Sequence, residues 1–238
     1  MDYLSLDPLG FLRLMQLADS ALPIGSASHS FGLETLAVER DVSVEHLNTF
    51  LEHYLHECGT LEASFCCSSY ILASRCEAEK FAEHLPALSM RLSAMKPARE
   101  SRAASATLGR RFLQLAYSLH QEPLLRVALD TIKAHGDDIH ASIAFGLVGS
   151  VLGIDERATV LAYLQQSITG LVSASQRLLP LGQQRASTLL WSLKPLLLTI
   201  AERGYTAAHT GQEVTYFTPL LDLGSMRHPS LETRLFIS

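Results

Sequence analysis

The sequence is poor in cysteine and aromatic residues and has no excess of positive charge. Aromatic residues make up 7% of the 238 residues, and 19 Lys and Arg face 24 Asp and Glu, for a net charge of −5. Binding of duplex DNA or RNA needs a broad cationic surface, so nucleic acid is not an expected partner. The four cysteines lack the C-x-x-C spacing of zinc and redox sites. We expect them to be buried thiols of a reducing compartment, at Cys58, Cys66, Cys67 and Cys76.

Phosphate-binding, export and membrane signals are also missing. Neither G-x-x-x-x-G-K-[ST] nor G-x-G-x-x-G occurs, so the chain has no cradle for a nucleotide. The N-terminus carries Asp2 and Asp7 where a secretory signal carries basic residues. The most apolar run, residues 139–154, contains His140 and is shorter than the roughly 20 residues of a membrane span. These features predict a cytoplasmic protein without a membrane segment.

Apolar residues at helical spacing dominate what remains, and 47% of the chain is hydrophobic. The pattern predicts an all-α fold, with one domain of about ten helices over residues 1–204 and an irregular C-terminal tail over 205–238. The apolar end of this tail is expected to dock on its own domain or on a partner, and the family resemblance given below implies that the tail orders when a partner binds. One helix is expected to run from Val44 to Cys58 and to end at Gly59, and Pro195 is expected to split another. Further breaks are expected at Pro86, Pro97, Pro123, Gly136 to Asp137, Gly153 to Asp155, and Pro180 to Gly182.

Two clusters leave alternative functions open. Ser28 beside His29 suggests a small serine hydrolase, although G-x-S-x-G is missing and sequence neighbours seldom face each other productively. The run of residues 52–58 suggests a nickel-binding or nickel-storage protein that uses His53 and His56, with Glu57 adjacent. Its order, H-x-x-H-E, differs from both H-E-x-x-H and H-x-x-E-H, so a solvated or partner-facing helix surface is the favoured interpretation. No catalytic residue, resident metal or cofactor is therefore assigned.

Five stretches carry a family resemblance. They are the early motif LADSALPIGSASHSFGLE at residues 17–34, the Arg- and Ser-rich segment 96–111, the segment 135–146, the motif RLLPLGQQ at 177–184, and the tail, PLLDLGSMRH at 219–228 with RLFIS at 234–238. Together, in this order and at compatible spacing, they resemble the UreF family of urease accessory proteins. The sequence departs from the family pattern at Ala27, where an aromatic residue is usual, and at Pro229, where an acidic residue is common.

The resemblance implies a homodimeric, non-catalytic scaffold that supports GTP-dependent nickel insertion into apo-urease. It implies three partners: UreD (also called UreH), the GTPase UreG, and apo-urease. Carried over by motif, the UreD-facing residues are Met226, Arg227, His228, Arg234, Leu235 and Phe236. The UreG-facing residues are Glu34, Arg177, Gly182 and Gln183, together with Arg99 and Arg102. A turn formed by Pro23, Gly25, Ser28 and His29 is expected to present His29 and Glu34 for recognition.

Overall fold

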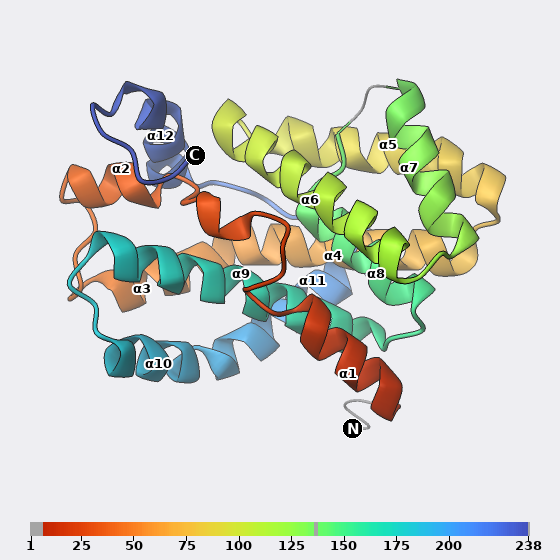
Figure 1. Ribbon diagram of the computed structural model, residues 1–238, viewed down its shortest axis with the longest axis horizontal. Coiled ribbons are helices and arrows are strands. Elements are labelled where there is room, and N and C mark those ends of the chain that lie inside the picture. Colours follow the sequence, from red (N-terminus) through yellow and green to blue (C-terminus); the bar gives the residue numbers. More distant parts are fainter. Residues whose placement is uncertain (1–6, 136–137, 238) are drawn as a thin grey trace.

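A computed structural model describes residues 7–135 and 138–237, so the expected break at Gly136 and Asp137 lies outside the described residues. Within these ranges the chain forms twelve α-helices and no strand, which confirms the all-α prediction with more helices than the expected ten (Figure 1). The α-helices are α1 Pro8–Leu17, α2 Leu33–Val38, α3 Leu47–Tyr54, α4 Thr60–Arg75, α5 Ala78–Met95, α6 Arg99–Leu119, α7 Pro123–His135, α8 Ala141–Val151, α9 Glu156–Leu178, α10 Gln183–Ser192, α11 Lys194–Thr210 and α12 Pro219–Arg227. Short 3-10 turns occur at η1 Ser26–Ser28 and η3 His228–Ser230, and a π-helical turn at η2 Leu55–Gly59.

The core is built around α4, which runs through the middle of the molecule and packs on α8 and α11 (Figure 1). The contact with α8 depends on Gly146, because a β-carbon at that position would overlap the backbone carbonyl oxygen of Cys66. A glycine thus allows two backbones to approach more closely than side chains would permit. The adjacent thiols of Cys66 and Cys67 are buried at this junction, and burial raises both of their pKa values.

The helix expected to end at Gly59 instead continues. The chain passes from α3 through η2 into α4 without a break. Gly59 has an ordinary helical φ of −59° rather than a left-handed one, and a β-carbon there would lie 3.3 Å from a methyl group of Ile200. Its role is therefore close packing against α11, not helix termination, and the predicted stop was wrong.

The prolines act in two ways. Pro195 lies in the first turn of α11, one residue after the break that follows α10, which confirms the predicted split. Pro86 lies inside α5 and does not end it. The helix continues there because Phe81, Leu85 and Leu92 are fully buried against the core, and their packing offsets the single backbone hydrogen bond that proline removes.

The C-terminal region is more ordered than the expected tail. Helix α11 extends to Thr210, past residue 204, and ends at Gly211, whose φ is +70°. Gly204 does not stop the helix because it lies against Ala63 of α4, where a side chain would clash. The tail then forms α12, which starts at Pro219. No helix within the described residues combines the length and the apolarity needed to cross a membrane.

Candidate partner-binding site

The early motif folds into a turn that fits closely against α12. Gly25 and Gly32 have φ values of +86° and +90°, a region that glycine enters without strain. A β-carbon on Gly32 would lie 2.7 Å from the carbonyl oxygen of Leu221 and 2.8 Å from the amide nitrogen of Ser225. Gly32 therefore serves both the start of α2 and the contact with α12, whose Ser225 also meets Ser101 of α6 through a 2.7 Å hydroxyl hydrogen bond.

The carboxylate of Glu34 is the centre of this contact. The backbone N–H of Leu235 donates to Oε1 over 2.6 Å, and the N–H of Phe236 donates to Oε2 over 3.2 Å. The same Oε2 lies 2.7 Å from Nε2 of His228. Glu34 is 2% exposed and His228 is 0% exposed. A buried carboxylate that accepts several hydrogen bonds has its charge satisfied. One residue of α2 thus holds three residues from the last eleven of the chain.

Arg177, at the end of α9, holds the same segment from the other side. Its guanidinium donates to the carbonyl oxygens of Ala27 over 2.8 Å and Leu235 over 3.4 Å, and lies 4.2 Å from the centre of the Phe236 ring. This is a cation–π contact, supported by burial of the ring. The N–H of Ile237 donates over 2.8 Å to the carbonyl oxygen of Ser28. We call the set Ser28, Glu34, Arg177, His228 and Phe236 the tail junction.

The tail junction joins residues that the sequence assigned to different partners. Glu34 and Arg177 were placed on the UreG-facing side, and His228 and Phe236 on the UreD-facing side, yet they contact one another. His29 is also buried, and burial, with the nearby Arg111 guanidinium, lowers its pKa. The structure therefore does not display the side chains of His29 and Glu34 as the sequence suggested, because both are covered by the protein itself. Of the other residues expected in the turn, Pro23 is exposed, and Gly25 and Ser28 are half-buried.

The outer face of α12 is apolar. Leu220, Leu223 and Met226 are each close to half exposed, while Leu221, Gly224 and Ser225 on the opposite face are buried. Phe217, just before the helix, and Leu235, in the tail, are exposed apolar side chains as well. Large apolar side chains that gather on an exposed face mark an interaction surface. We call Phe217, Leu220, Leu223, Met226 and Leu235 the α12 surface.

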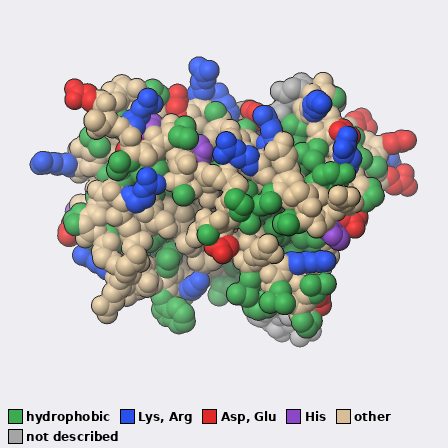
Figure 2. Space-filling model, viewed as in Figure 1, with side chains coloured by type: hydrophobic (Ala, Val, Ile, Leu, Met, Phe, Trp, Pro, Cys, Tyr) green, Lys and Arg blue, Asp and Glu red, His purple; other side chains and the backbone are tan. Residues whose placement is uncertain are grey.

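Charged side chains border this surface. Arg227 forms a 3.1 Å ion pair with Glu39 of α2, and Arg234 is exposed. On the face drawn in Figure 2, Lys and Arg are scattered among hydrophobic and acidic side chains and form no broad patch. The basic residues are thus placed singly, as they are at the rim of a protein interface.

The other UreG-side candidates lie outside the tail junction. Arg102 donates to the carbonyl oxygens of Lys96 and Pro97, so it holds the connection from α5 to α6. Arg99 is the exposed first residue of α6. Gly182 caps the N-terminus of α10 and Gln183 begins that helix, both exposed.

A polar chamber that the sequence did not reveal lies beneath the early motif. It is a cavity of about 110 Å³ between α3, α4, α6, α9 and the tail. Lys96 and Glu62 form a buried ion pair on its wall, and the hydroxyl of Tyr163 donates to Glu62 over 3.2 Å. Burial disfavours the charged form of both side chains, but the attraction between the two opposite charges and their hydrogen bond together outweigh it. The pKa of Glu62 is therefore lowered and that of Lys96 is raised. The available signal was Glu62, a lone charge in the apolar run 61–73.

His140, next to this pair, predicts a dependence of stability on pH. Its Nε2 lies 2.8 Å from the hydroxyl of Ser93, and burial, with the nearby charge of Lys96, lowers its pKa from 6.5 to about 4. Since the unfolded chain binds the proton more readily, stability should fall as pH drops from about 6.5 towards 4, by up to roughly 3 kcal/mol. Urea unfolding between pH 7 and pH 4 measures this.

The matched comparison for this prediction is His140→Gln, which cannot titrate in that range. Carboxylates titrate in both proteins, so the difference between the two curves isolates the imidazole. We expect the wild type to lose more stability on acidification than the variant. Parallel curves would show that His140 takes up its proton equally in both states.

The two alternative sites receive little support from the geometry. His53 is exposed, and Nδ1 of His56 accepts from Arg203 over 3.0 Å. Over residues 7–135 and 138–237, no three His, Cys, Asp or Glu side chains are grouped so that they could hold a metal ion. For the hydrolase alternative, His29 is buried against the ring of Phe31, with 6.0 Å between ring centres.

Comparison with known proteins agrees with the family resemblance. A UreF family model matches residues 42–194. The urease accessory protein UreF of Nostoc sp. (strain PCC 7120) is 33% identical over 240 residues and covers 100% of both chains. The UreF of Trichormus variabilis is 32% identical and covers 100% of both chains. The UreF of Corynebacterium glutamicum is 31% identical, and the match covers 94% of this chain and 96% of that protein. The chain belongs to the UreF family, the non-catalytic accessory proteins of urease maturation.

Proposed function

We propose that the chain is a homodimeric scaffold of the urease activation complex, which binds UreD through the α12 surface and the tail and, with UreD, recruits UreG and apo-urease. The α12 surface is the observation that carries this proposal. Five large apolar side chains of one segment are exposed there, although the opposite face of the same helix packs normally. A surface of this kind gains stability when a partner covers it.

The tail junction gives the proposed surface its shape. Glu34 and Arg177 fix the backbone of residues 235–236, so that Leu235 and Ile237 project outward while Phe236 is buried. Glu34, Arg177 and His228 thus act by positioning the tail, and Met226, Arg227, Arg234 and Leu235 are the residues that meet UreD. Gly182, Gln183, Arg99 and Arg102 remain our candidates for the UreG-facing side. GTP hydrolysis and nickel handling are proposed to belong to UreG, with nickel as cargo.

Co-purification tests this function. The chain is expressed with UreD and UreG of the same organism, and a deletion strain is assayed for nickel-dependent urease activity. We expect UreD to co-purify with the chain, UreG to join the pair, and deletion to abolish the activity. If neither protein co-purifies and urease activity survives the deletion, the scaffold assignment fails. Tight nickel binding to the isolated chain that is lost in the double variant His53→Ala and His56→Ala would favour the nickel-storage alternative. Ester hydrolysis that is lost in Ser28→Ala would favour the hydrolase alternative.

Arg234 provides a prediction that separates binding from folding. Its side chain is exposed, and within the described residues it makes no ion pair. Arg234→Ala should therefore leave helix content and thermal midpoint unchanged while it weakens UreD binding by about 2 kcal/mol, the effect of an interface arginine. Titration calorimetry with UreD measures the loss. Arg13→Ala, on the distant helix α1, is the control, and a fall in thermal midpoint for Arg234→Ala would make this residue structural.

A further inference from the structure

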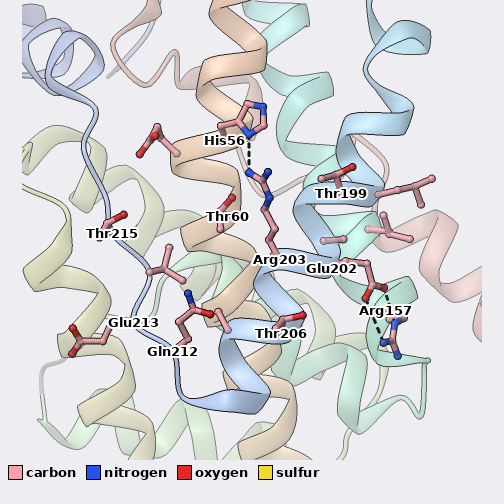
Figure 3. Close-up of a pocket in the computed structure, with 16 residues that line it drawn as sticks. His56, Thr60, Arg157, Thr199, Glu202, Arg203, Thr206, Gln212, Glu213 and Thr215 are labelled. Atoms are coloured by element: carbon pink, nitrogen blue, oxygen red, sulfur yellow. Dashed lines mark hydrogen bonds and ion pairs between the residues drawn. The ribbon is translucent and has the colours of Figure 1, made fainter.

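A groove of about 1290 Å³ lies beside the segment that leads into the α12 surface, and no residue of that surface lines it. Its walls are the end of η2, the start of α4, α9, α11 and residues 212–215 (Figure 3). The floor contains the apolar side chains of Leu161, Leu198 and Val214. Neither the early motif nor the tail junction contributes to it. The groove therefore has no role in the function proposed so far.

One wall of the groove is an extended segment with open backbone edges. From Glu213 to Phe217 the side chains alternate between exposed and half-buried, with Val214 and Tyr216 turned inward. The backbone N–H and C=O groups of residues 212–217 make no hydrogen bond to any described residue. A second hollow, of about 430 Å³, lies on the other side of residues 211–214, against α4 and α5. Both backbone edges of this segment are thus open, and an open edge is a template for an added strand.

The opposite wall carries charges that the protein does not pair. His56 and Glu57 lie on the π-helical turn η2, a distortion of the helix that often marks functional sites. Arg203 donates to His56, and in Figure 3 these two side chains point toward each other at one end of the groove. Among the described residues Arg203 has no carboxylate partner, and Glu57 and Glu213 have no basic partner. Charges of both signs therefore remain for an occupant.

We propose that this groove binds an extended segment of a partner protein, which adds as a β-strand beside residues 212–217. A polypeptide fits because it supplies the N–H and C=O groups that the open edge needs, at the spacing of a ladder. Its apolar side chains would cover Leu161 and Leu198, and a carboxylate would pair with Arg203, whose planar fork suits it. The inference rests on the proposed function for its partners, UreD, UreG and apo-urease.

Amide hydrogen exchange of the chain, free and in its complex with these partners, tests the pairing. A strand added to one edge bonds every second residue, so protection should alternate. Either the amides of Glu213 and Thr215 or those of Gln212 and Val214 should slow on complex formation, while the other set stays fast. A helix docked in the groove gives no alternation. Uniformly unchanged exchange across residues 212–217 in the complex would overturn the proposal.

Proline substitution tests the same edge by affinity. Thr215→Pro and Val214→Pro each remove one amide from a segment that is already extended, and they act on opposite edges. One of them should weaken binding of the partner about tenfold, the effect of one lost ladder hydrogen bond, relative to the alanine variant at the same position, Thr215→Ala or Val214→Ala, which keeps its amide. Arg203→Gln should also weaken binding and reduce its salt dependence. If the wild type binds its partner but each proline variant binds as tightly as the alanine variant at the same position, this inference fails and the proposed function stands. If the wild type binds no partner, the proposed function fails.

Discussion

Replacing Lys96 by methionine should lower the free energy of unfolding by about 3–5 kcal/mol at pH 7. Methionine keeps most of the side-chain volume, but it leaves the carboxylate of Glu62 buried without its cation. The hydrogen bond from Tyr163 remains and cannot neutralise the charge. Urea unfolding followed by circular dichroism measures the loss. A matched control is Lys194→Met, because Lys194 is an exposed lysine bonded only to Gln165, and this change should alter stability by less than about 0.5 kcal/mol.

The pH dependence of the Lys96→Met variant identifies the cause. Without Lys96, burial raises the pKa of Glu62 above its unfolded value, so the deficit is largest above that raised pKa and shrinks as pH falls through it. The double variant with Glu62→Gln should recover stability at pH 7, because no charge is then buried. A loss that is independent of pH and unchanged in the double variant would instead reflect packing.

Local sequence signals predicted the individual helices well. Asp7 accepts hydrogen bonds from the amides of Leu9 and Gly10, and Pro8 follows it in the first turn of α1, as the cap signature indicates. The split at Pro195 and the breaks at Pro97 and Pro123 follow from the same local chemistry. The signals failed where tertiary contacts decide. Gly59 and Gly204 look like helix ends, yet both lie within helical segments. The absence of a side chain at each lets a neighbouring helix pack closely against it.

The candidate site was predicted as a set of residues but not as an arrangement. Glu34 and His228 are 194 positions apart, and no periodicity relates an early turn to the chain end. Family motifs name residues without saying which are exposed. The motif alone therefore cannot show that the carboxylate of Glu34 binds the tail of its own chain. The open backbone edge of residues 212–217 could not be predicted, because it depends on which other segments lie beside it in the fold.

Glu34→Gln should release the end of the chain and abolish tight binding of UreD. Glutamine is isosteric with glutamate, but it keeps only one of the two acceptor oxygens. Its NH2 group therefore faces either the N–H of Leu235, or the N–H of Phe236 and the ring of His228. Leaving buried donors unsatisfied costs about 1–3 kcal/mol each. We expect loss of amide protection at residues 235 and 236, and a fall in UreD affinity of at least a hundredfold, because the tail must then be ordered at the moment of binding.

Glu39→Gln is the matched control, because Glu39 is an exposed carboxylate at the C-terminal end of α2, the helix that carries Glu34. Among the described residues its one ion pair is with Arg227. Its effect on stability and UreD binding should be within about 0.5 kcal/mol, as for other surface ion pairs. Phe236→Ala should resemble Glu34→Gln in both measurements, since the ring and the carboxylate hold the same segment. If the tail of Glu34→Gln loses protection while UreD binds as tightly as before, the tail is not part of the UreD interface, and the α12 surface alone would have to account for the binding.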